Sequence, residues 1–322
     1  MEKIIIAINL GGISNRIICL ISVWRLGDKL KRKTILYWPR NHTCGCKFKD
    51  LFENDVKEIN ENQLLKIKRK NMQFFKDISL TIKNSPKKHL ITGTSIFLLT
   101  PIELKKYPNL KKSNSFGGDG IGFNFLNIPE EIKKEILKYL KRLKPLKSLQ
   151  KEIDNFQRKN NLKGMIGVHI RRGDFADRPT SPGKVSSNKK FIERMEELIK
   201  DKPETKFFLC TDSEEMEKMM EEKFPKRIFK FQKESFTRTD VRATQEGLID
   251  LSLLSKTKHI LGTYRSTFTE MAWWFGGCKP KMEIIIDSEK QKEYLENVKK
   301  AERDIITKIK RVILRLIGRK FI

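Results

Sequence analysis

Residues 164–178 read GMIGVHIRRGDFADR, and the expected fold is worked outward from this stretch. It opens with a short apolar run from Met165 to Ile170, which predicts a strand buried on both faces, as in a parallel sheet. Two arginines, a glycine and Asp174 follow at once. Ligands of open α/β sheets bind beyond the carboxyl ends of the strands, so charge here indicates an anion site. An Arg–Asp pair that closes a surface loop is the plainer alternative.

Arg171 and Arg172 suit phosphate because a guanidinium offers paired N–H donors and stays charged at any working pH. Gly173 permits the tight turn, or the close backbone approach, that such a site needs. His169 lies one residue before the strand ends. We expect all three polar side chains to face a common ligand.

Strands and helices alternate after this stretch, which predicts a parallel sheet. The expected strands are 164–170, 206–211, 227–231, 258–262 and 282–286, and the helices are 188–201, 213–223, 242–255 and 266–275. The N-terminal half begins in the same way, with a strand at 3–8, a turn at 9–14, a helix at 15–30 and a strand at 34–38. Further elements are short strands at 89–92 and 95–99, a glycine-rich loop at 113–127 that suits an acceptor-side loop or a plain connector, and a helix at 130–143. We expect two α/β domains, residues 1–150 and 151–300, joined in the polar segment 144–163.

The composition is strongly basic. The 322 residues contain 68 Lys+Arg and 40 Asp+Glu, a formal net charge of +28. Such an excess favours anionic partners. Lysine is spread over most expected helices, however, and the informative arginines sit at strand ends instead of being interleaved with aromatic residues. A non-enzymatic nucleic-acid-binding protein is therefore the less favoured alternative.

Cysteine use and apolar runs bear on the compartment. No CxxC pair or disulfide framework is present, which favours a reducing cytosol. The first residues form too short an apolar run for a signal peptide, and no run approaches the ~18 residues of a membrane span. His42, Cys44 and Cys46 offer three soft ligands without a fourth, so no metal site is expected. The other cysteines are Cys19, Cys210 and Cys278.

The C-terminal tail, residues 305–322, contains six cations and no acid. Its apolar residues fall on one helical stripe opposite most of the cations. This pattern predicts a helix, within a segment 301–322, that lies on an anionic membrane surface. A terminal helix packed on the first domain is the alternative. The protein is expected to be cytoplasmic, with a place on the inner face of the membrane if the tail binds there.

Two further segments offer ligand contacts. Asn15 and Arg16 follow the turn that holds Gly12, where Ser14 or Asn15 as a helix cap is an equal alternative. Ser266, Thr267 and Thr269 fall in the first turn of a helix, where free amides attract phosphate, although Ser266 also suits a plain N-cap. Arg265 adds a cation beside them, whereas Trp273 and Trp274 are expected in the core.

Two carboxylates are further candidates for ligand contacts. Asp212 or Ser213 suits the cap of the next helix, and a carboxylate at a strand end equally accepts from ribose hydroxyls. Asp250 lies among leucines, and a buried carboxylate needs a partner. A ligand that donates hydrogen bonds would serve, as would a hydrogen bond within the fold.

These residues also carry a family resemblance. HIRRGDF at 169–175 resembles the HxRRGD(Y/F) signature of the GDP-fucose-dependent fucosyltransferases, the group of α1,2-, α1,6- and protein O-fucosyltransferases. TDSEE at 211–215, residues 248–274 and GGISNR at 11–16 resemble the other conserved regions of that group, in the same order. The resemblance implies two Rossmann-like domains facing a cleft, the glycosyltransferase B arrangement.

The resemblance also implies roles for single residues. His169 and Asp250 would bind guanine, Arg171 the β-phosphate, and the hydroxyls of residues 266–269 the diphosphate. Phe268 would also contact the donor. The activity implied is metal-independent transfer of fucose from GDP-fucose to a glycan, with inversion and no cofactor; another GDP-sugar is the alternative donor. The sequence has no DxD pair, so protein cations must stabilise the leaving diphosphate, Arg171 first and Arg172 second. Asp174 or Asp177 would serve as the base, unless Asp174 pairs with Arg172.

Overall fold

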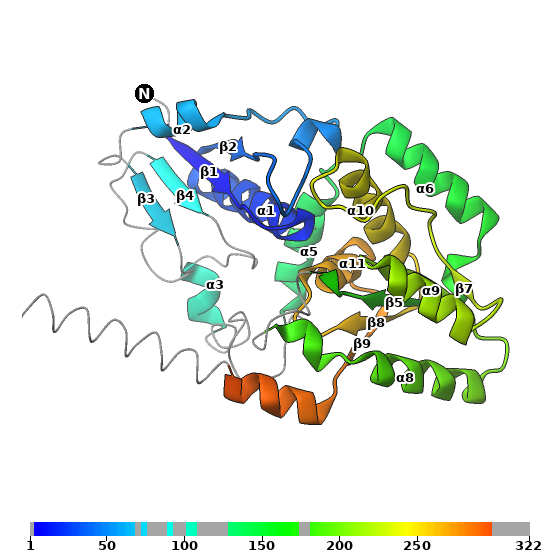
Figure 1. Ribbon diagram of the computed structural model, residues 1–322. Coiled ribbons are helices and arrows are strands. Elements are labelled where there is room, and N and C mark those ends of the chain that lie inside the picture. The colour runs from blue at the N-terminus through cyan, green and yellow to red at the C-terminus, as the bar shows by residue number, and fades with distance from the viewer. Residues whose placement is uncertain are drawn as a thin grey trace, which may run out of the picture.

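The computed structural model describes residues 3–67, 72–75, 89–92, 101–107, 128–173 and 181–297. Within them, two parallel sheets lie side by side (Figure 1). The first sheet has the order β2-β1-β4-β3, and the second β7-β6-β5-β8-β9. The expected mixed α/β fold with parallel sheets is confirmed. The strands are β1 (Ile4–Ile8), β2 (Lys33–Tyr37), β3 (Met72–Phe75), β4 (His89–Thr92), β5 (Ile166–Ile170), β6 (Phe207–Thr211), β7 (Ile228–Phe229), β8 (His259–Thr263) and β9 (Lys281–Ile285).

The second sheet determines where a ligand can bind. From β5 the chain moves outward through β6 to β7 on one side, and through β8 to β9 on the other. The strand order therefore reverses between β5 and β8. A crevice opens at such a point beyond the carboxyl ends of the strands, because the two flanking connections leave on opposite sides.

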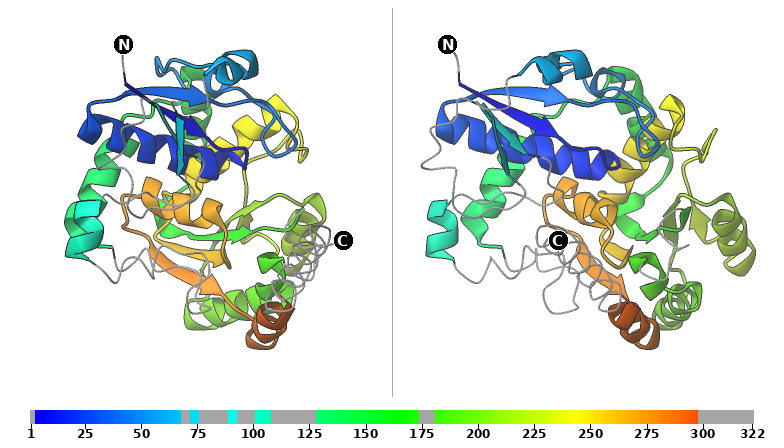
Figure 2. Two further views of the ribbon diagram at one scale, coloured as in Figure 1. Left: turned by 90° about the vertical axis from the view of Figure 1, so that its left-hand side faces the viewer. Right: turned by 60° about the vertical axis from the view of Figure 1, so that its left-hand side comes forward.

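Helices pack around both sheets. α1 lies between the first sheet and α11, as the views in Figure 2 show. The same views place a last helix, residues 288–297, beside the start of α8, where Ser187 Oγ donates to Asp287 Oδ2 at 2.9 Å. The α-helices are α1 (Ile13–Leu30), α2 (Glu61–Lys66), α3 (Pro101–Lys106), α5 (Glu130–Leu140), α6 (Lys147–Lys159), α8 (Asn188–Asp201), α9 (Glu214–Lys223), α10 (Val241–Leu254) and α11 (Thr267–Phe275), and short 3₁₀ turns are η1 (Phe48–Asp50), η4 (Leu162–Gly164) and η5 (Pro182–Val185).

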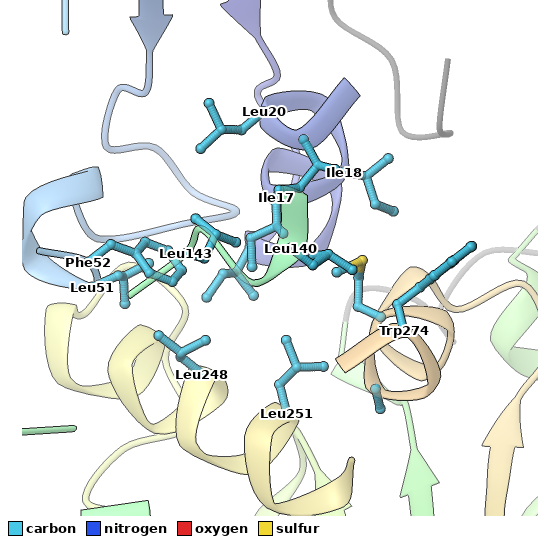
Figure 3. Close-up of a cluster of buried hydrophobic side chains, with 14 of the residues drawn as sticks. Ile17, Ile18, Leu20, Leu51, Phe52, Leu140, Leu143, Leu248, Leu251 and Trp274 are labelled. Atoms are coloured by element: carbon cyan, nitrogen blue, oxygen red, sulfur yellow. The ribbon is translucent and has the colours of Figure 1, made fainter. Parts of the chain in front are cut away.

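A single hydrophobic cluster joins the helices of the two halves (Figure 3). Ile17 and Ile18 of α1 face Leu248 and Leu251 of α10, and all four are fully buried. Trp274 of α11 closes the cluster at 0 % exposure and Trp273 belongs to it at 3 %, so the expectation that this pair is core is confirmed. Burying one large apolar side chain contributes about 2–3 kcal/mol, so this cluster fixes the relative position of the two halves.

The structure differs from the sequence-based expectation in several places, and the short helices α2 and α3 are among the elements that were not expected. The segment 144–163, expected as a polar linker, holds helix α6, which buries Leu149 and Ile153 and packs on α10. Strand β3 was not expected, and β7 has two residues instead of five. The strand 95–99, the loop 113–127 and the tail 305–322 lie outside the described residues. The division into domains 1–150 and 151–300 stays a prediction.

No disulfide bond joins the cysteines of the described residues. Cys44 and Cys46 are buried with their Sγ atoms 3.9 Å apart, whereas His42 is exposed. Over the residues described, no group of three or more His, Cys, Asp or Glu side chains is arranged to hold a metal ion. In the same part of the chain, no helix has the length and hydropathy that a bilayer crossing requires.

Candidate active site

A cavity of about 550 Å³ opens beyond the carboxyl ends of β5, β6 and β8 and reaches the turn before α1. It therefore lies at the point where the strand order of the second sheet reverses. Most of the residues expected to bind a donor line it. These are Gly12, Asn15, His169, Arg171, Asp212, Asp250, Ser266, Thr267 and Phe268.

His169 sits on β5 at one wall of the cavity. Its Nδ1 lies 2.7 Å from Thr269 Oγ1 of α11, and its ring stacks on Phe268 with centroids 4.7 Å apart. Burial, followed by the positive charges of Arg171 and Arg172, lowers the pKa of His169 to about 3. The imidazole is therefore neutral at physiological pH, with one nitrogen held by Thr269. Thr269 supports His169 through this contact and does not itself line the cavity.

The fold holds Arg171 at the cavity through both its backbone and its side chain. Its backbone N–H donates to Thr263 Oγ1 at 2.9 Å, and Thr263 in turn donates to the carbonyl of His169, which ties β5 to β8. Its guanidinium forms an ion pair with Asp212 at the end of β6. The side chain is 12 % exposed. Asp212 thus aims Arg171 while leaving it in contact with the cavity.

Gly173 and Asp212 fix the geometry of this turn. Gly173 has a φ of +35°, and a Cβ atom there would lie 2.5 Å from Asp212 Oδ2. Asp212 Oδ1 accepts from the Arg172 backbone N–H at 2.7 Å. The helix cap belongs to Ser213, whose side chain accepts from Met216 N. Of the two alternatives for a cap here, Ser213 is the one observed, and Asp212 positions the arginine turn.

Arg172 points away from the cavity. Its Nε donates to Asn188 Oδ1 at 2.8 Å, and its two terminal nitrogens donate to the carbonyls of Arg171 and Ser186 at 2.8 Å. Burial lowers its pKa to about 10, so it stays charged at neutral pH. The structure does not place Arg172 among the cavity residues, and its contacts hold the turn to the start of α8. Asp174 and Asp177, the expected bases, lie outside the described residues.

The start of α11 forms another wall of the cavity. Ser266 occupies the N-cap position, but its side chain makes no capping hydrogen bond, so the expected plain cap is not observed. The first-turn amides lack an intrahelical partner and bind anions readily. Arg265 precedes them in a left-handed conformation, φ 55°, and its Nη1 donates to Tyr294 Oη at 2.7 Å.

One face of α10 forms the far end of the cavity. Ala243, Gly247 and Asp250 follow a spacing of four and three residues, so they lie on one side of the helix and all line the cavity. Phe236 and Phe268 supply flat apolar walls. Small residues and aromatic rings leave a slot suited to a planar base.

Asp250 is the polar group of that slot. It is 3 % exposed, its Oδ2 lies 3.1 Å from Lys233 Nζ, and its Oδ1 has no hydrogen-bond partner. Burial raises its pKa to about 6, and Lys233 opposes that rise. An unpartnered buried carboxylate oxygen is costly, so it fits a ligand that donates a hydrogen bond.

At the N-terminal wall, Asn15 contacts the cavity but Arg16 does not. Arg16 is 1 % exposed and donates to the Gly11 carbonyl at 2.7 Å, to the Pro39 carbonyl at 2.7 Å and to Asn41 Oδ1 at 2.9 Å. It braces the turn from inside. The N-cap of α1 is Gly12, without a side-chain capping bond, so neither Ser14 nor Asn15 is the cap.

Sequence reasoning missed the loop between β7 and α10. This loop brings Lys233, Phe236 and Arg238 to the cavity, and Arg238 Nη2 lies 3.9 Å from Asp212 Oδ2. Tyr294 and Thr43 were missed as well. The loop follows a strand of the second sheet, so the rule that ligands bind at the carboxyl ends of strands was the signal that could have found it.

Parallel sheets with a cation-lined cavity at the reversal of strand order are the arrangement in which α/β proteins bind anionic, nucleotide-like ligands. The sequence model of glycosyl transferase family 11 matches residues 59–303, and the chain belongs to this family. It is therefore a glycosyltransferase, and the family resemblance drawn from the sequence is confirmed. A search of curated proteins finds no match for the chain.

Solved structures share the fold. NodZ α-1,6-fucosyltransferase soaked with GDP-fucose is 18 % identical with a TM-score of 0.51, covering 85 % of this chain and 93 % of NodZ. The NodZ fucosyltransferase from Bradyrhizobium gives 18 % and 0.50, covering 84 % and 92 %. A mutant of FUT1 from Arabidopsis thaliana in complex with GDP gives 13 % and 0.57, covering 88 % and 70 %. At these identities the likeness establishes the fold.

Proposed function

We propose that the protein transfers fucose from GDP-fucose to a glycan acceptor, with inversion and without a metal ion or other cofactor. The observation that carries the proposal is one cavity that joins a cluster of cations to a buried carboxylate oxygen without a partner. A diphosphate needs the first and a guanine ring the second. Two structural neighbours support the choice of donor: NodZ was soaked with GDP-fucose, and the FUT1 mutant is in complex with GDP.

The guanine ring fits the slot on α10. The N1 and N2 donors of guanine match Asp250 Oδ1, and a flat ring fits between the aromatic walls. Adenine presents an acceptor at N1, which would face the carboxylate unfavourably. Neutral His169, stacked on Phe268, offers its remaining ring nitrogen to the base or the ribose.

The diphosphate fits between Arg171 and the start of α11. Transfer breaks the bond between the sugar C1 and the β-phosphate oxygen, so negative charge grows on that phosphate. Arg171 stabilises this charge with a donor that Asp212 already holds in place. Because no solvent needs to reorganise, such a donor lowers the barrier by about 2.7–4 kcal/mol. The acceptor hydroxyl approaches from the side of Asn15 and Gly12 and loses its proton to a base, for which Asp174 or Asp177 stays the prediction.

The proposal includes the glycosyltransferase B arrangement, with residues 1–150 on the acceptor side and 151–300 on the donor side. A cavity lined from both halves supports it. The proposal also includes a cytoplasmic enzyme whose basic tail, residues 305–322, binds an anionic membrane. Deleting the tail should reduce binding to phosphatidylserine vesicles and leave turnover of a soluble acceptor unchanged; unfolding of the shortened protein would instead make the tail structural.

A thermal-shift panel separates this function from its alternatives. Selective stabilisation by GDP over ADP and UDP supports a GDP-sugar enzyme, because a ligand that binds only the folded state raises Tm. Comparison of GDP-fucose with GDP-mannose then tests the donor sugar. Equal responses to GDP, heparin and RNA would favour a basic nucleic-acid-binding protein.

A further inference from the structure

Lys233 occupies a position that the donor chemistry does not explain. It is a lysine with a side chain only 6 % exposed, at the slot end of the cavity. Its Nζ lies 2.6 Å from Glu217 Oε1 and 3.1 Å from Asp250 Oδ2, and it sits 5.2 Å from the centroid of the Phe236 ring. All of these contacts are to protein groups, so Lys233 is held in the wall of the slot.

We propose that Lys233 is the positioning residue for nucleobase recognition: it holds Asp250 ionised and oriented, so that Asp250 Oδ1 accepts from a base with N–H donors on its edge. This inference rests on the proposed use of a GDP-sugar and adds the residue that enforces the choice of guanine over adenine.

The surroundings of Asp250 show why it needs such a partner. Two carboxylates act on Asp250, Glu217 of α9 and Glu246 one turn earlier on α10. The Sγ atom of Cys210, on β6, lies 3.7 Å from the backbone carbonyl oxygen of Asp250. Burial and these two acidic neighbours favour the protonated form, and Lys233 is the cation that opposes them. Burial disfavours the charge on Lys233 as well, but the carboxylates of Asp250 and Glu217 outweigh that effect and raise its pKa above the usual value.

The protonation state of Asp250 decides which base fits. An ionised carboxylate only accepts, so it matches the donor edge of guanine. A protonated carboxyl carries an O–H donor, which matches the N1 acceptor of adenine. Removing the positive charge of Lys233 raises the pKa of Asp250 further, so at neutral pH the guanine preference should collapse.

Lys230 provides a matched control. It pairs with the same Glu217, at 2.7 Å, and with Glu221 at 3.0 Å, but it does not line the cavity. In Lys233→Met, Glu217 keeps the ion pair with Lys230, so one buried acid is not left without a cation. Lys230→Met removes a neighbouring lysine of the same cluster while leaving the contact to Asp250.

The experiment measures the dissociation constants of GDP and ADP by calorimetry at pH 7 and pH 9. Both ligands carry the same diphosphate, so its titration cancels in the ratio of the two constants. Wild type and Lys230→Met should prefer GDP at both pH values, with ratios that agree within about threefold. Lys233→Met should lose at least tenfold of the preference at pH 7 and recover it at pH 9, since one pH unit changes the ionised fraction up to tenfold.

Asp250→Asn should show a weak preference at both pH values. Lys233→Met with the wild-type ratio at pH 7, or with no recovery at pH 9, would overturn the inference. If Lys233→Met does not fold, Lys233→Gln takes its place in the same measurement, with the same expected loss of preference at pH 7 and recovery at pH 9. A wild-type ratio at pH 7 in Lys233→Gln overturns the inference. Wild type without any preference for GDP would instead refute the proposed function.

Discussion

Replacing Arg171 with alanine removes the cation assigned to the leaving diphosphate, and the structure separates its catalytic effect from its structural one. The guanidinium is 12 % exposed and its carboxylate partner, Asp212, is 21 % exposed. Asp212 keeps the hydrogen bond from the Arg172 backbone N–H and the nearby Arg238 after the change. Water can reach the carboxylate oxygen that Arg171 leaves, so the loss of folding free energy should be about 1–2 kcal/mol.

The catalytic effect should be larger. Loss of a preorganised donor to growing charge costs about 2.7–4 kcal/mol of transition-state stabilisation, which lowers kcat by about 10²–10³-fold. Arg171→Lys should restore little, because an ammonium lacks the forked pair of donors. GDP should also bind more weakly, since the same contact serves the ground state.

The assay is GDP release from GDP-fucose, with Tm measured on the same samples. Arg194→Ala is the control: Arg194 pairs with Glu283 and Glu197 outside the cavity, with a side chain 28 % exposed. It should lose a similar amount of stability and keep kcat within about twofold. A normal kcat in Arg171→Ala, or an equal loss in both variants, would show that Arg171 acts only as an ion-pair partner.

Three further outcomes are expected. Gly173→Ala places a Cβ 2.5 Å from Asp212 Oδ2 in a left-handed turn, so kcat should fall at least about tenfold and Tm should fall with it. Gly247→Ala is the control, because no atom lies within 4 Å of its new Cβ, and it should keep the wild-type Tm. The pKa of His169 is lower in the folded protein than its unfolded value of 6.5. Its contribution to the free energy of unfolding is therefore fully present above pH 6.5 and is lost as pH falls toward 3. In urea titrations from about pH 6.5 to 4, the stability of the wild type should decline more steeply than that of His169→Asn. Turnover should survive excess EDTA, because the cavity carboxylates Asp212 and Asp250 are paired with Arg171 and Lys233; loss with EDTA and rescue by Mn²⁺ would refute this mechanism.

The sequence predicted most of the second sheet because its strands are short apolar runs with charged residues at their ends. His169 and Arg171 could be placed at the site since strand ends meet at one edge of a parallel sheet. Arg172, the next residue, could not be separated from Arg171, because only the turn at Gly173 decides which side chain faces the cavity. Helix α6 was missed since its apolar stripe, Leu149 and Ile153, is narrow within a polar segment.

The slot for the base was the part hardest to predict. Asp250 was found because a carboxylate among leucines is conspicuous. Lys233 and Arg238 were not, since the loop KFQKESFTRTD at 230–240 consists mostly of charged and polar residues, which is typical of a solvated connector in a chain with this composition. Their role depends on the loop folding back over α10, a tertiary contact that no local pattern encodes.

The most direct test of the central claim is the hydrolysis of nucleotide sugars in the absence of an acceptor, followed by chromatography of the released nucleotide. GDP-fucose, GDP-mannose and UDP-galactose are compared, with Arg171→Ala as the blank. We predict GDP release from GDP-fucose at a rate at least about tenfold above the other donors and above the blank. Equal rates for all donors, or release that Arg171→Ala leaves unchanged, would contradict a GDP-fucose-dependent enzyme that works through this cavity.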